Sequence, residues 1–414
     1  MLLLINFYKQ FSIFFEFLFK LLLKRVVFFM NKIFLKVFCL LCLSLIAISS
    51  LKSNVSVFAE SEFNVNAKAS ILIDFNSGEI LVENNADEKL EIASMVKLMT
   101  VYLTLQAIEN QEISLSDNLV ASPYAASMGG SQVFLDANNS YNIEKMLQSV
   151  IMASANDASV ALAEHISGSE KEFVNKMNQT AEKLGMTNTL YANATGLPAP
   201  MQHSSAKDTA VILSKLVNNE TYHKYSCMWM DKLVHPSGRT TEIVNTNKLS
   251  RYYEGCDSGK TGFTDEAGYC LAVSAKRNDM RLISVVIGTK SSKERFSESV
   301  SLLNYGFASF KNQQIISSDD AVSYINITKS KTKTAKVFAK EDFYALTKKG
   351  TQHNYTYSLE IPKAISAPIV SGSEVGKIII SKNGEVVKEI PLVIKEDIKA
   401  YSFFEALEGV LEKW

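Results

Sequence analysis

The sequence predicts an α+β fold, in which an antiparallel sheet with a helical subdomain is followed by a small all-β domain. Strand-rich stretches near Lys68 and again before Thr289 bracket a series of helical patterns, and this order is typical of a sheet covered by helices. Beyond Phe310 the chain is polar, short in period and rich in Thr, Lys and Val, which favours strands. With 414 residues, the chain can hold two or three domains.

Residues 1–59 are predicted to be a leader and a secretory signal. Residues 31–36 carry two lysines and precede an uncharged apolar run over 37–51. That run is shorter than the roughly 20 residues needed to span a bilayer. Val57-Phe58-Ala59 then supplies small side chains at the two positions that signal peptidase recognises. We therefore expect export and a mature start near Glu60.

Met30 is the expected true start of the protein. Residues 1–29 are apolar but are interrupted by charged side chains, so we interpret them as a translated upstream extension. An uncleaved N-terminal anchor is the alternative interpretation.

The first globular segment is predicted over residues 60–310. It begins with a hairpin over 68–85, which turns at Asn76-Ser77-Gly78. The helix after Ser204-Ser205 has a pair suited to N-capping, and Asn278-Asp279 joins two strands. Hydrophobic periodicity places helices over 95–110, 143–154, 158–166, 170–184, 207–219 and 293–310, and strands over 268–277 and 280–289.

Residues 311–395 are expected to form the small β-rich domain, with a hairpin that turns at Asn383-Gly384 in type I′ geometry. Residues 396–414 are expected to form an amphipathic C-terminal helix. Contact with a membrane surface is one interpretation of that helix, although its glutamates are unfavourable against anionic lipid. Packing on the β-rich domain is the other. The apolar face of the helix consists of Phe403, Phe404, Leu407, Leu411 and Trp414.

Composition excludes several classes of function. Lys+Arg and Asp+Glu are both 43, so the net charge of +0 provides no basic field for a nucleic-acid partner. The five histidines are scattered without metal-ligand spacing, and we expect no metal and no cofactor. The mature chain keeps Cys227, Cys256 and Cys270. An odd count argues against a disulfide framework, so we expect three buried thiols.

A lysine stands among apolar residues in "ASMVKLMT", three positions after a serine. On a helix, Ser94 and Lys97 lie on one face, so the hydroxyl and the amine can meet. If desolvation keeps Lys97 neutral, its amine can accept the serine proton and make Ser94 a nucleophile. The structural alternative is a lysine whose stem carries the charge to the surface.

Two further short motifs follow in the chain. Ser154-Ala155-Asn156 places a hydroxyl and an amide on a loop after a helix, where they could relay a proton and hold a substrate amide. Ordinary turn or cap chemistry is the alternative for this pair. Lys260-Thr261-Gly262 is predicted on a strand before a turn. Its amine and hydroxyl suit a carboxylate, and Gly262 leaves room for a ligand backbone.

In this order, S-x-x-K, S-x-N and K-T-G resemble the signature of penicillin-binding proteins and serine β-lactamases. Over residues 65–310, and more loosely over 311–395, the chain resembles the low-molecular-mass penicillin-binding D-alanyl-D-alanine carboxypeptidases. Stretches that carry this resemblance include "ASMVKLMTVYLTLQAIENQEISLSD", "GGSQVFL" and "GKTGFTDEAGYCLAVSAKRNDMRLISVVIG". It implies a penicillin-binding/serine β-lactamase-like fold, with peptidoglycan stem peptides and β-lactam antibiotics as partners.

The resemblance also implies a role for each motif residue. Ser94 would be the acylated nucleophile and Lys97 its general base. Ser154 and Asn156 would line the catalytic cleft.

The third motif would bind the substrate. Lys260 and Thr261 would hold its terminal carboxylate beside Gly262. The backbone N–H groups of Ser94 and Phe263 would form the oxyanion hole.

Three positions depart from the pattern of the family. Phe263 follows K-T-G where some relatives have histidine, but the donor there is a backbone group and is retained. Thr246 stands where some relatives have arginine, which weakens the expected affinity for a carboxylate. Ser258-Gly259 replaces the more usual Gly-hydrophobic pair.

Two alternatives to a carboxypeptidase are weighed on sequence. A class A β-lactamase would place an E-x-x-x-N pattern between the second and third motifs, and no Glu in 157–259 has Asn four residues on. A non-catalytic wall-binding or penicillin-sensing module would be expected to lose a motif residue, and none is lost. The sequence thus predicts a serine-type D-Ala-D-Ala carboxypeptidase that trims stem pentapeptides in the cell wall or at the outer face of the cytoplasmic membrane.

Overall fold

The computed structural model describes residues 65–351 and 355–405. The predicted leader and signal and residues 406–414 of the predicted C-terminal helix lie outside these residues, so the predictions for them remain predictions. The prediction of a helix from residue 396 was wrong for its first part, because residues 396–402 are not helical and Ile398 instead forms a β-bridge with Ile369. Only residues 403–405 of the described part are helical. Within the described residues, no helix is both long enough and apolar enough to cross a bilayer.

The first part of the described chain is built on a five-stranded antiparallel sheet with the order β2-β1-β9-β8-β7. The hairpin predicted at its start and the pair joined at Asn278-Asp279 are both present. Strand β7, which carries the K-T-G motif, is at one edge. The strands are β1 (Ala69–Asp74), β2 (Ile80–Asn84), β7 (Cys256–Thr264), β8 (Gly268–Arg277) and β9 (Met280–Thr289).

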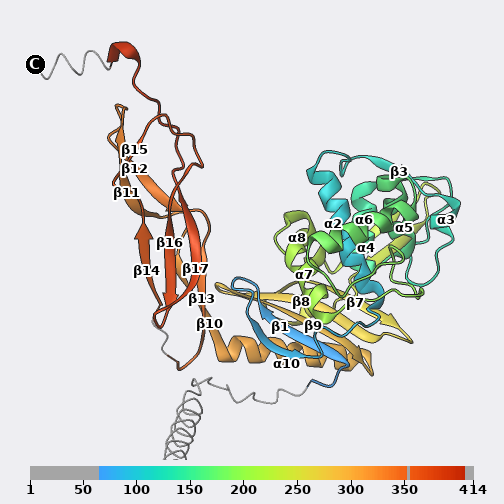
Figure 1. Ribbon diagram of the computed structural model, residues 1–414. Helices are drawn as coiled ribbons and strands as arrows, with labels where there is room; N and C mark the ends of the chain where they lie inside the picture. The colour runs from blue at the N-terminus through green and yellow to red at the C-terminus, as the bar shows by residue number, and fades with distance from the viewer. Residues whose placement is uncertain (1–64, 352–354, 406–414) are drawn as a thin grey trace, which may run out of the picture. The chain divides into compact units, whose positions relative to one another are not determined.

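Helices lie on both faces of this sheet. Figure 1 shows α10 (Ser292–Ser309) on one face and the helical subdomain on the other. The subdomain surrounds α2 (Lys97–Glu109), which is apolar on nearly all sides and is therefore buried. The other helical elements are η1 (Ala93–Val96), α3 (Pro123–Ala126), α4 (Ile143–Ala153), α5 (Asn156–Ser167), α6 (Glu170–Lys183), α7 (Ala206–Leu216), α8 (Glu220–Cys227) and α9 (Leu249–Tyr252).

Two short antiparallel strand pairs in this part were not predicted. One pairs β3 (Asn118–Val120) with β4 (Ser140–Asn142), and the other pairs β5 (Met230–Val234) with β6 (Thr240–Val244). Strands of three to five residues give too few alternating positions for periodicity to detect. The prediction for Cys227 was also wrong, because its side chain is exposed, whereas Cys256 and Cys270 are buried; all three are free thiols.

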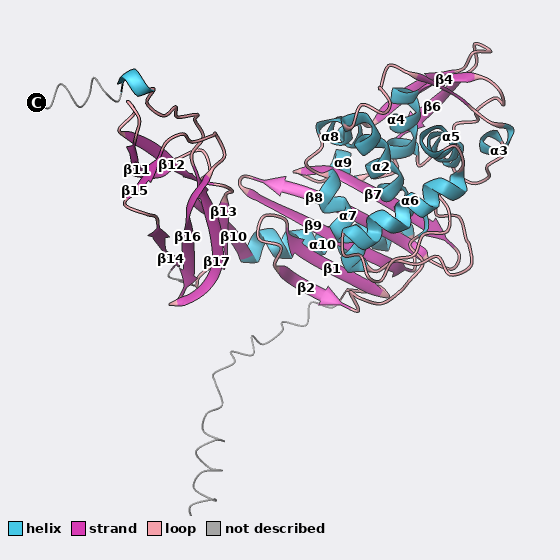
Figure 2. Ribbon diagram, turned by 45° about the horizontal axis from the view of Figure 1, so that its top comes forward, coloured by secondary structure: helices cyan, strands magenta, loops and turns pink. Residues whose placement is uncertain are grey.

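The second part is all-β, as predicted, and is coloured magenta with the other strands in Figure 2. Its six-stranded sheet has the order β14-β16-β17-β12-β11-β15, and β10 pairs with β13. Asn383 and Gly384 both have positive φ, at 53° and 90°, as a type I′ turn requires. The strands are β10 (Phe310–Ile316), β11 (Ala321–Thr328), β12 (Thr334–Ala339), β13 (Phe343–Lys348), β14 (Tyr355–Glu360), β15 (Ala364–Ser366), β16 (Glu374–Lys382) and β17 (Glu385–Val393).

Candidate active site

The first motif forms the contact that its spacing predicts. Ser94 lies in the 3-10 turn η1, and Lys97 is the first residue of α2. Lys97 Nζ donates a hydrogen bond to Ser94 Oγ at 3.0 Å. The turn starts at Ala93, whose φ of 47° is unusual for a residue with a side chain. The residue immediately before the serine therefore has a backbone conformation that L-residues rarely adopt.

Lys97 is fully buried, with 0% of its surface exposed. The alternative in which its stem carries the charge to solvent is therefore wrong. Burial, and then the positive charge of Lys260, hold the pKa of Lys97 well below its ordinary value, although Asp157 opposes the shift. An amine with a lowered pKa is available in its neutral form, which can accept a proton from Ser94.

A backbone carbonyl completes the surroundings of Lys97. The amine also donates to the carbonyl oxygen of Thr195, in a loop far away in sequence. Asn193 Oδ1 holds that loop by accepting from the N–H groups of Thr195 and Gly196 at 3.1 and 2.7 Å. A Cβ on Gly196 would lie 2.0 Å from the carbonyl oxygen of Ala93. Only glycine lets this loop close beneath the turn that carries Ser94.

The second and third motifs meet through a hydrogen bond between side chains. Lys260 Nζ donates to Ser154 Oγ at 2.7 Å and to the carbonyl oxygen of Thr261 at 3.0 Å. Lys260 is 2% exposed. Burial, together with the positive charge of Arg295, lowers the pKa of Lys260 to about 7. Two lysines of lowered pKa thus face two serine hydroxyls in one buried region.

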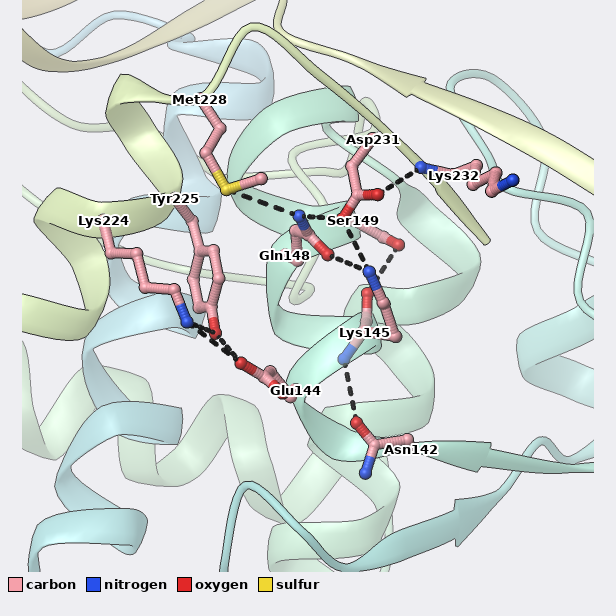
Figure 3. A network of polar contacts seen from close by, with 10 residues as sticks. All are labelled: Asn142, Glu144, Lys145, Gln148, Ser149, Lys224, Tyr225, Met228, Asp231 and Lys232. Carbon is pink, nitrogen blue, oxygen red and sulfur yellow. Dashed lines mark hydrogen bonds and ion pairs between the residues drawn. The ribbon is translucent and has the colours of Figure 1, made fainter. Parts of the chain in front are cut away.

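Ser154 is positioned by the end of α4. It caps the helix in the left-handed conformation, with φ of 62° and ψ of 31°, rather than extending the helix to 154 as predicted. Figure 3 shows how the preceding turns of α4 are held: Lys145 and Gln148 both reach Asp231 of β5 at 2.6 Å. Glu144 contacts Tyr225 and Lys224 of α8. These contacts fix the helix whose last turn presents Ser154.

Asn156 begins α5, so the amide of the second motif lies on a helix rather than on the predicted loop. Its Nδ2 donates to the carbonyl oxygen of Gly129 at 2.7 Å. Its Oδ1 is buried without a hydrogen-bond partner. A buried acceptor of this kind normally finds a partner, so this oxygen remains available to a ligand.

Asp157 is a buried carboxylate next to Asn156 in the chain, and the sequence analysis did not select it. Its buried carboxylate accepts from the backbone N–H groups of Val133 and Leu135 at 3.1 Å. Burial raises the pKa of Asp157, while these hydrogen bonds lower it. Its position next to Asn156 in the chain was the signal that could have found it.

The K-T-G strand runs directly past the turn that carries Ser94. A Cβ on Gly262 would lie 2.6 Å from the carbonyl oxygen of Ile92 and 3.4 Å from the nitrogen of Ser94. Glycine is therefore required for this close approach. Thr261 Oγ1 donates to Thr246 Oγ1 at 2.9 Å, so the residue that stands where some relatives have arginine contacts the motif directly. This hydrogen bond links two neutral hydroxyl groups, so Thr246 brings no positive charge to the motif.

Phe263 is 48% exposed, and its ring stacks on Tyr269 with centroids 4.2 Å apart. Its side chain therefore lies against Tyr269, its pairing partner on strand β8. Thr195 and Arg295, like Asp157, were missed by sequence reasoning. Thr195 contributes only a carbonyl, which any residue type has, so no sequence signal marks it.

The arrangement suits acyl transfer. It contains a hydroxyl beside a buried amine that can be neutral, a second hydroxyl beside a second such amine, and a strand whose Gly262 passes close to Ser94. Within 65–351 and 355–405, no group of three His, Cys, Asp or Glu could hold a metal ion.

Comparisons with known proteins agree with this chemistry. Residues 56–291 match the family described as D-alanyl-D-alanine carboxypeptidase, and residues 310–400 match the penicillin-binding protein 5 C-terminal domain. The chain is similar to the D-alanyl-D-alanine carboxypeptidase DacF of Bacillus subtilis (strain 168), with 38% identity over 382 residues. That match covers 91% of this chain and 98% of the relative.

Solved structures give the same result. Penicillin-binding protein 5 from Haemophilus influenzae matches with a TM-score of 0.67 and 32% identity, covering 81% of this chain and 98% of that one. Penicillin-binding protein D2 from Listeria monocytogenes, in its ampicillin-bound form, matches with a TM-score of 0.51 and 30% identity, covering 59% of this chain and 98% of that one. The present chain belongs to the D-alanyl-D-alanine carboxypeptidase family of low-molecular-mass penicillin-binding proteins.

Proposed function

We propose that the protein removes the terminal D-alanine from peptidoglycan stem pentapeptides through an acyl-enzyme on Ser94, and that penicillins acylate the same residue. One observation carries this proposal: the fully buried Lys97 amine lies 3.0 Å from Ser94 Oγ. A lysine with a lowered pKa in that position can take the serine proton as the hydroxyl attacks.

In the acylation step, Ser94 Oγ forms a bond to the carbonyl carbon of the penultimate D-alanine while its proton passes to Lys97 Nζ. The carbonyl oxygen becomes an oxyanion between the backbone N–H groups of Ser94 and Phe263. Removing one donor of such a hole costs roughly 3–4 kcal/mol of transition-state stabilisation. The close approach of Gly262 to Ser94 brings strand β7 and the turn η1, which carry the two donors, together.

The tetrahedral intermediate collapses when the C–N bond breaks and a proton is delivered to the leaving amine. Lys97 holds the proton taken from Ser94, and the Ser154–Lys260 pair offers a second donor on the same cleft. D-alanine leaves, water enters, and Lys97 accepts the proton of that water as it attacks the ester. Hydrolysis releases the tetrapeptide and restores Ser94.

The substrate carboxylate is assigned to Lys260 and Thr261. A cationic Lys260 would attract the carboxylate, and binding of an anion would in turn raise the lowered pKa of this lysine. Thr246 adds a hydroxyl to Thr261 and no charge. We therefore infer that carboxylate binding relies on Lys260, with Asn156 holding the substrate amide.

We infer that the protein acts outside the cytoplasm, because its substrate class is found there. The predicted signal ending at Ala59 supports export. A mature N-terminus near Glu60, measured by N-terminal sequencing of the secreted protein, is the expected result. An intact N-terminus retained in the cytoplasmic fraction would contradict the inference.

The decisive experiment is to incubate the purified chain with diacetyl-Lys-D-Ala-D-Ala and assay released D-alanine. Ser94→Ala should abolish release and covalent penicillin labelling while leaving the circular dichroism spectrum unchanged. Mass spectrometry of the parent after brief penicillin exposure should give one adduct, on Ser94, that outlasts a peptide turnover. Labelling that persists in Ser94→Ala would place the nucleophile elsewhere, and rapid repeated penicillin turnover would indicate a β-lactamase.

A further inference from the structure

Arg295 is a partly buried arginine with no carboxylate partner among the residues that the structure describes. It lies in the first turn of α10, between the rings of Tyr269 and Phe296, with centroids 5.4 and 5.0 Å from its guanidinium carbon. Its Nε is buried without a hydrogen-bond partner. Desolvation lowers the pKa of Arg295, so the environment disfavours its charge. An unpaired cation in such a position is expensive for folding alone.

The guanidinium of Arg295 donates a hydrogen bond to the peptide unit between Gly262 and Phe263. Arg295 Nη1 donates to the carbonyl oxygen of Gly262 at 3.0 Å. That carbonyl belongs to the same peptide unit as the N–H of Phe263, and the unit is trans. In a trans peptide the C=O and N–H point in opposite directions. The guanidinium therefore holds one end of the peptide whose other end is assigned to the oxyanion hole.

We propose that Arg295 is a positioning residue that orients and polarises the Gly262–Phe263 peptide, making the Phe263 N–H a stronger donor to the oxyanion. This inference rests on the function proposed above. A cation on the carbonyl oxygen draws electron density along the amide, and cooperative strengthening is about 10–30% per hydrogen bond. The same positive charge also favours the negative charge that develops on the reacting oxygen.

The placement of the strand explains why such support is needed. Strand β7 is at the edge of its sheet, so β8 is its only strand neighbour. Gly262 has no side chain to anchor it, because a Cβ would collide with the nucleophile turn. The contact with Arg295 supplies an anchor on the backbone itself. Nη2 of Arg295 is in turn held by Ser292 Oγ at 3.3 Å.

The test compares three variants of the full mature chain with the parent. Arg295→Met keeps the apolar stem between the two rings but removes the charge and the donor. Arg295→Lys keeps the positive charge but replaces the planar guanidinium by an ammonium group, whose donors are arranged differently. Lys293→Met is the matched control, because it removes an exposed positive charge from the same turn of α10 without touching β7.

Two measurements separate positioning from simple structural support. Stopped-flow acylation by penicillin gives the binding constant and the maximal rate separately. Infrared spectroscopy of the penicilloyl-enzyme gives the stretching frequency of the ester carbonyl, which falls as the oxyanion hole donates more strongly. Arg295→Met should lower the maximal acylation rate about 10-fold, a part of the 10²–10³-fold effect of a whole donor. Its carbonyl band should move to higher frequency.

Arg295→Lys should give an intermediate rate and band, and Lys293→Met should match the parent in both. A weaker binding constant with an unchanged maximal rate would overturn the proposal and make Arg295 a carboxylate-binding residue. An unchanged carbonyl band in a folded Arg295 variant would also overturn it, as would the failure of both Arg295 variants to fold. If the parent itself forms no adduct on Ser94, the proposed function fails instead.

Discussion

The α+β part and the all-β part of the described chain differ in whether charged side chains are buried. In the α+β part, Lys97, Asp157 and Lys260 are buried near one another. In the all-β part, no charged side chain among the described residues beyond Phe310 is buried. Its lysines lie on the surface in ion pairs such as Lys377 with Glu389 at 3.0 Å.

The difference shows that the α+β part, and not the all-β part, contains buried charged groups that reduce folding stability. The β-rich core is an apolar cluster dominated by isoleucine, which is what folding alone favours. Burying an ammonium group is unfavourable unless it is paired or loses its proton. The α+β part buries two lysines that contact serine hydroxyls and carbonyls instead of carboxylates. Such an arrangement is what the proposed reaction requires.

The largest expected effect comes from changing the base while keeping its charge. Lys97→Arg should reduce acylation about a thousandfold, within the range for general-base catalysis, because a guanidinium stays protonated. In the parent, the acylation rate should rise with pH through the lowered pKa of Lys97, since only the neutral amine accepts a proton. Penicillin acylation measured between pH 5 and 10 checks both expectations.

The exposed Lys293→Arg is the matched control and should retain full activity. Substantial activity in Lys97→Arg would reduce this lysine to a positioning charge. A rate independent of pH would contradict its role as a base.

The second effect is a gain in stability at the expense of activity. Lys260→Met should impair peptide hydrolysis but raise the free energy of unfolding at pH 6 by roughly 1–3 kcal/mol, after the lost hydrogen bonds are deducted. The lysine has a folded pKa of about 7 and an ordinary value of 10.5. Between these values the unfolded parent binds more protons than the folded parent, so its stability rises with pH.

The free energy of unfolding of Lys260→Met should therefore exceed that of the parent by the full amount below pH 7. This difference should shrink as the pH rises and vanish towards pH 10.5. Urea denaturation at pH 6, 8 and 10 measures this trend. A variant less stable than the parent at pH 6 would show that the buried lysine supports the fold.

A smaller effect is expected from removing the all-β part. A chain ending at Phe310 keeps all three motifs and should hydrolyse a short soluble peptide at nearly the parental rate. It loses Asn312, whose Nδ2 donates to the buried Asp74 carboxylate at 2.7 Å, and should be destabilised by about 1–3 kcal/mol. Asn312→Ala in the full chain should reproduce most of that loss. An inactive but folded truncation would show that the β domain helps to build the site.

The smallest effect should come from a surface charge in the all-β part. Lys377 contacts Glu389 and Glu360 across neighbouring strands, and all three side chains are well exposed. Solvent screens such pairs, so Lys377→Met should change neither the melting temperature nor D-alanine release measurably. Differential scanning calorimetry is the measurement. A clear drop in melting temperature would mean that surface charges also stabilise this domain.

The local parts of the structure were predictable from sequence because their causes are local. Periodicity located the long helices and the sheet strands, and Asn383-Gly384 predicted its turn. The Ser94–Lys97 contact follows from three-residue spacing on a helical turn. The two short strand pairs were missed because their strands contain too few residues for periodicity to show. The exposure of Cys227 was missed because a residue type alone does not fix its exposure.

By itself, the sequence determined the long helices and most strands of the main sheet, the order of the three motifs and the family to which they belong. Only the tertiary structure decided how those motifs meet. Ser154 and Lys260 are 106 residues apart in sequence and are joined by a hydrogen bond that exists only in the folded chain. The carbonyl of Thr195 and the guanidinium of Arg295 act on Lys97 and Gly262 through contacts that no local pattern encodes. The physical reason is that burial, and with it the pKa of each lysine, depends on everything that excludes water from the site.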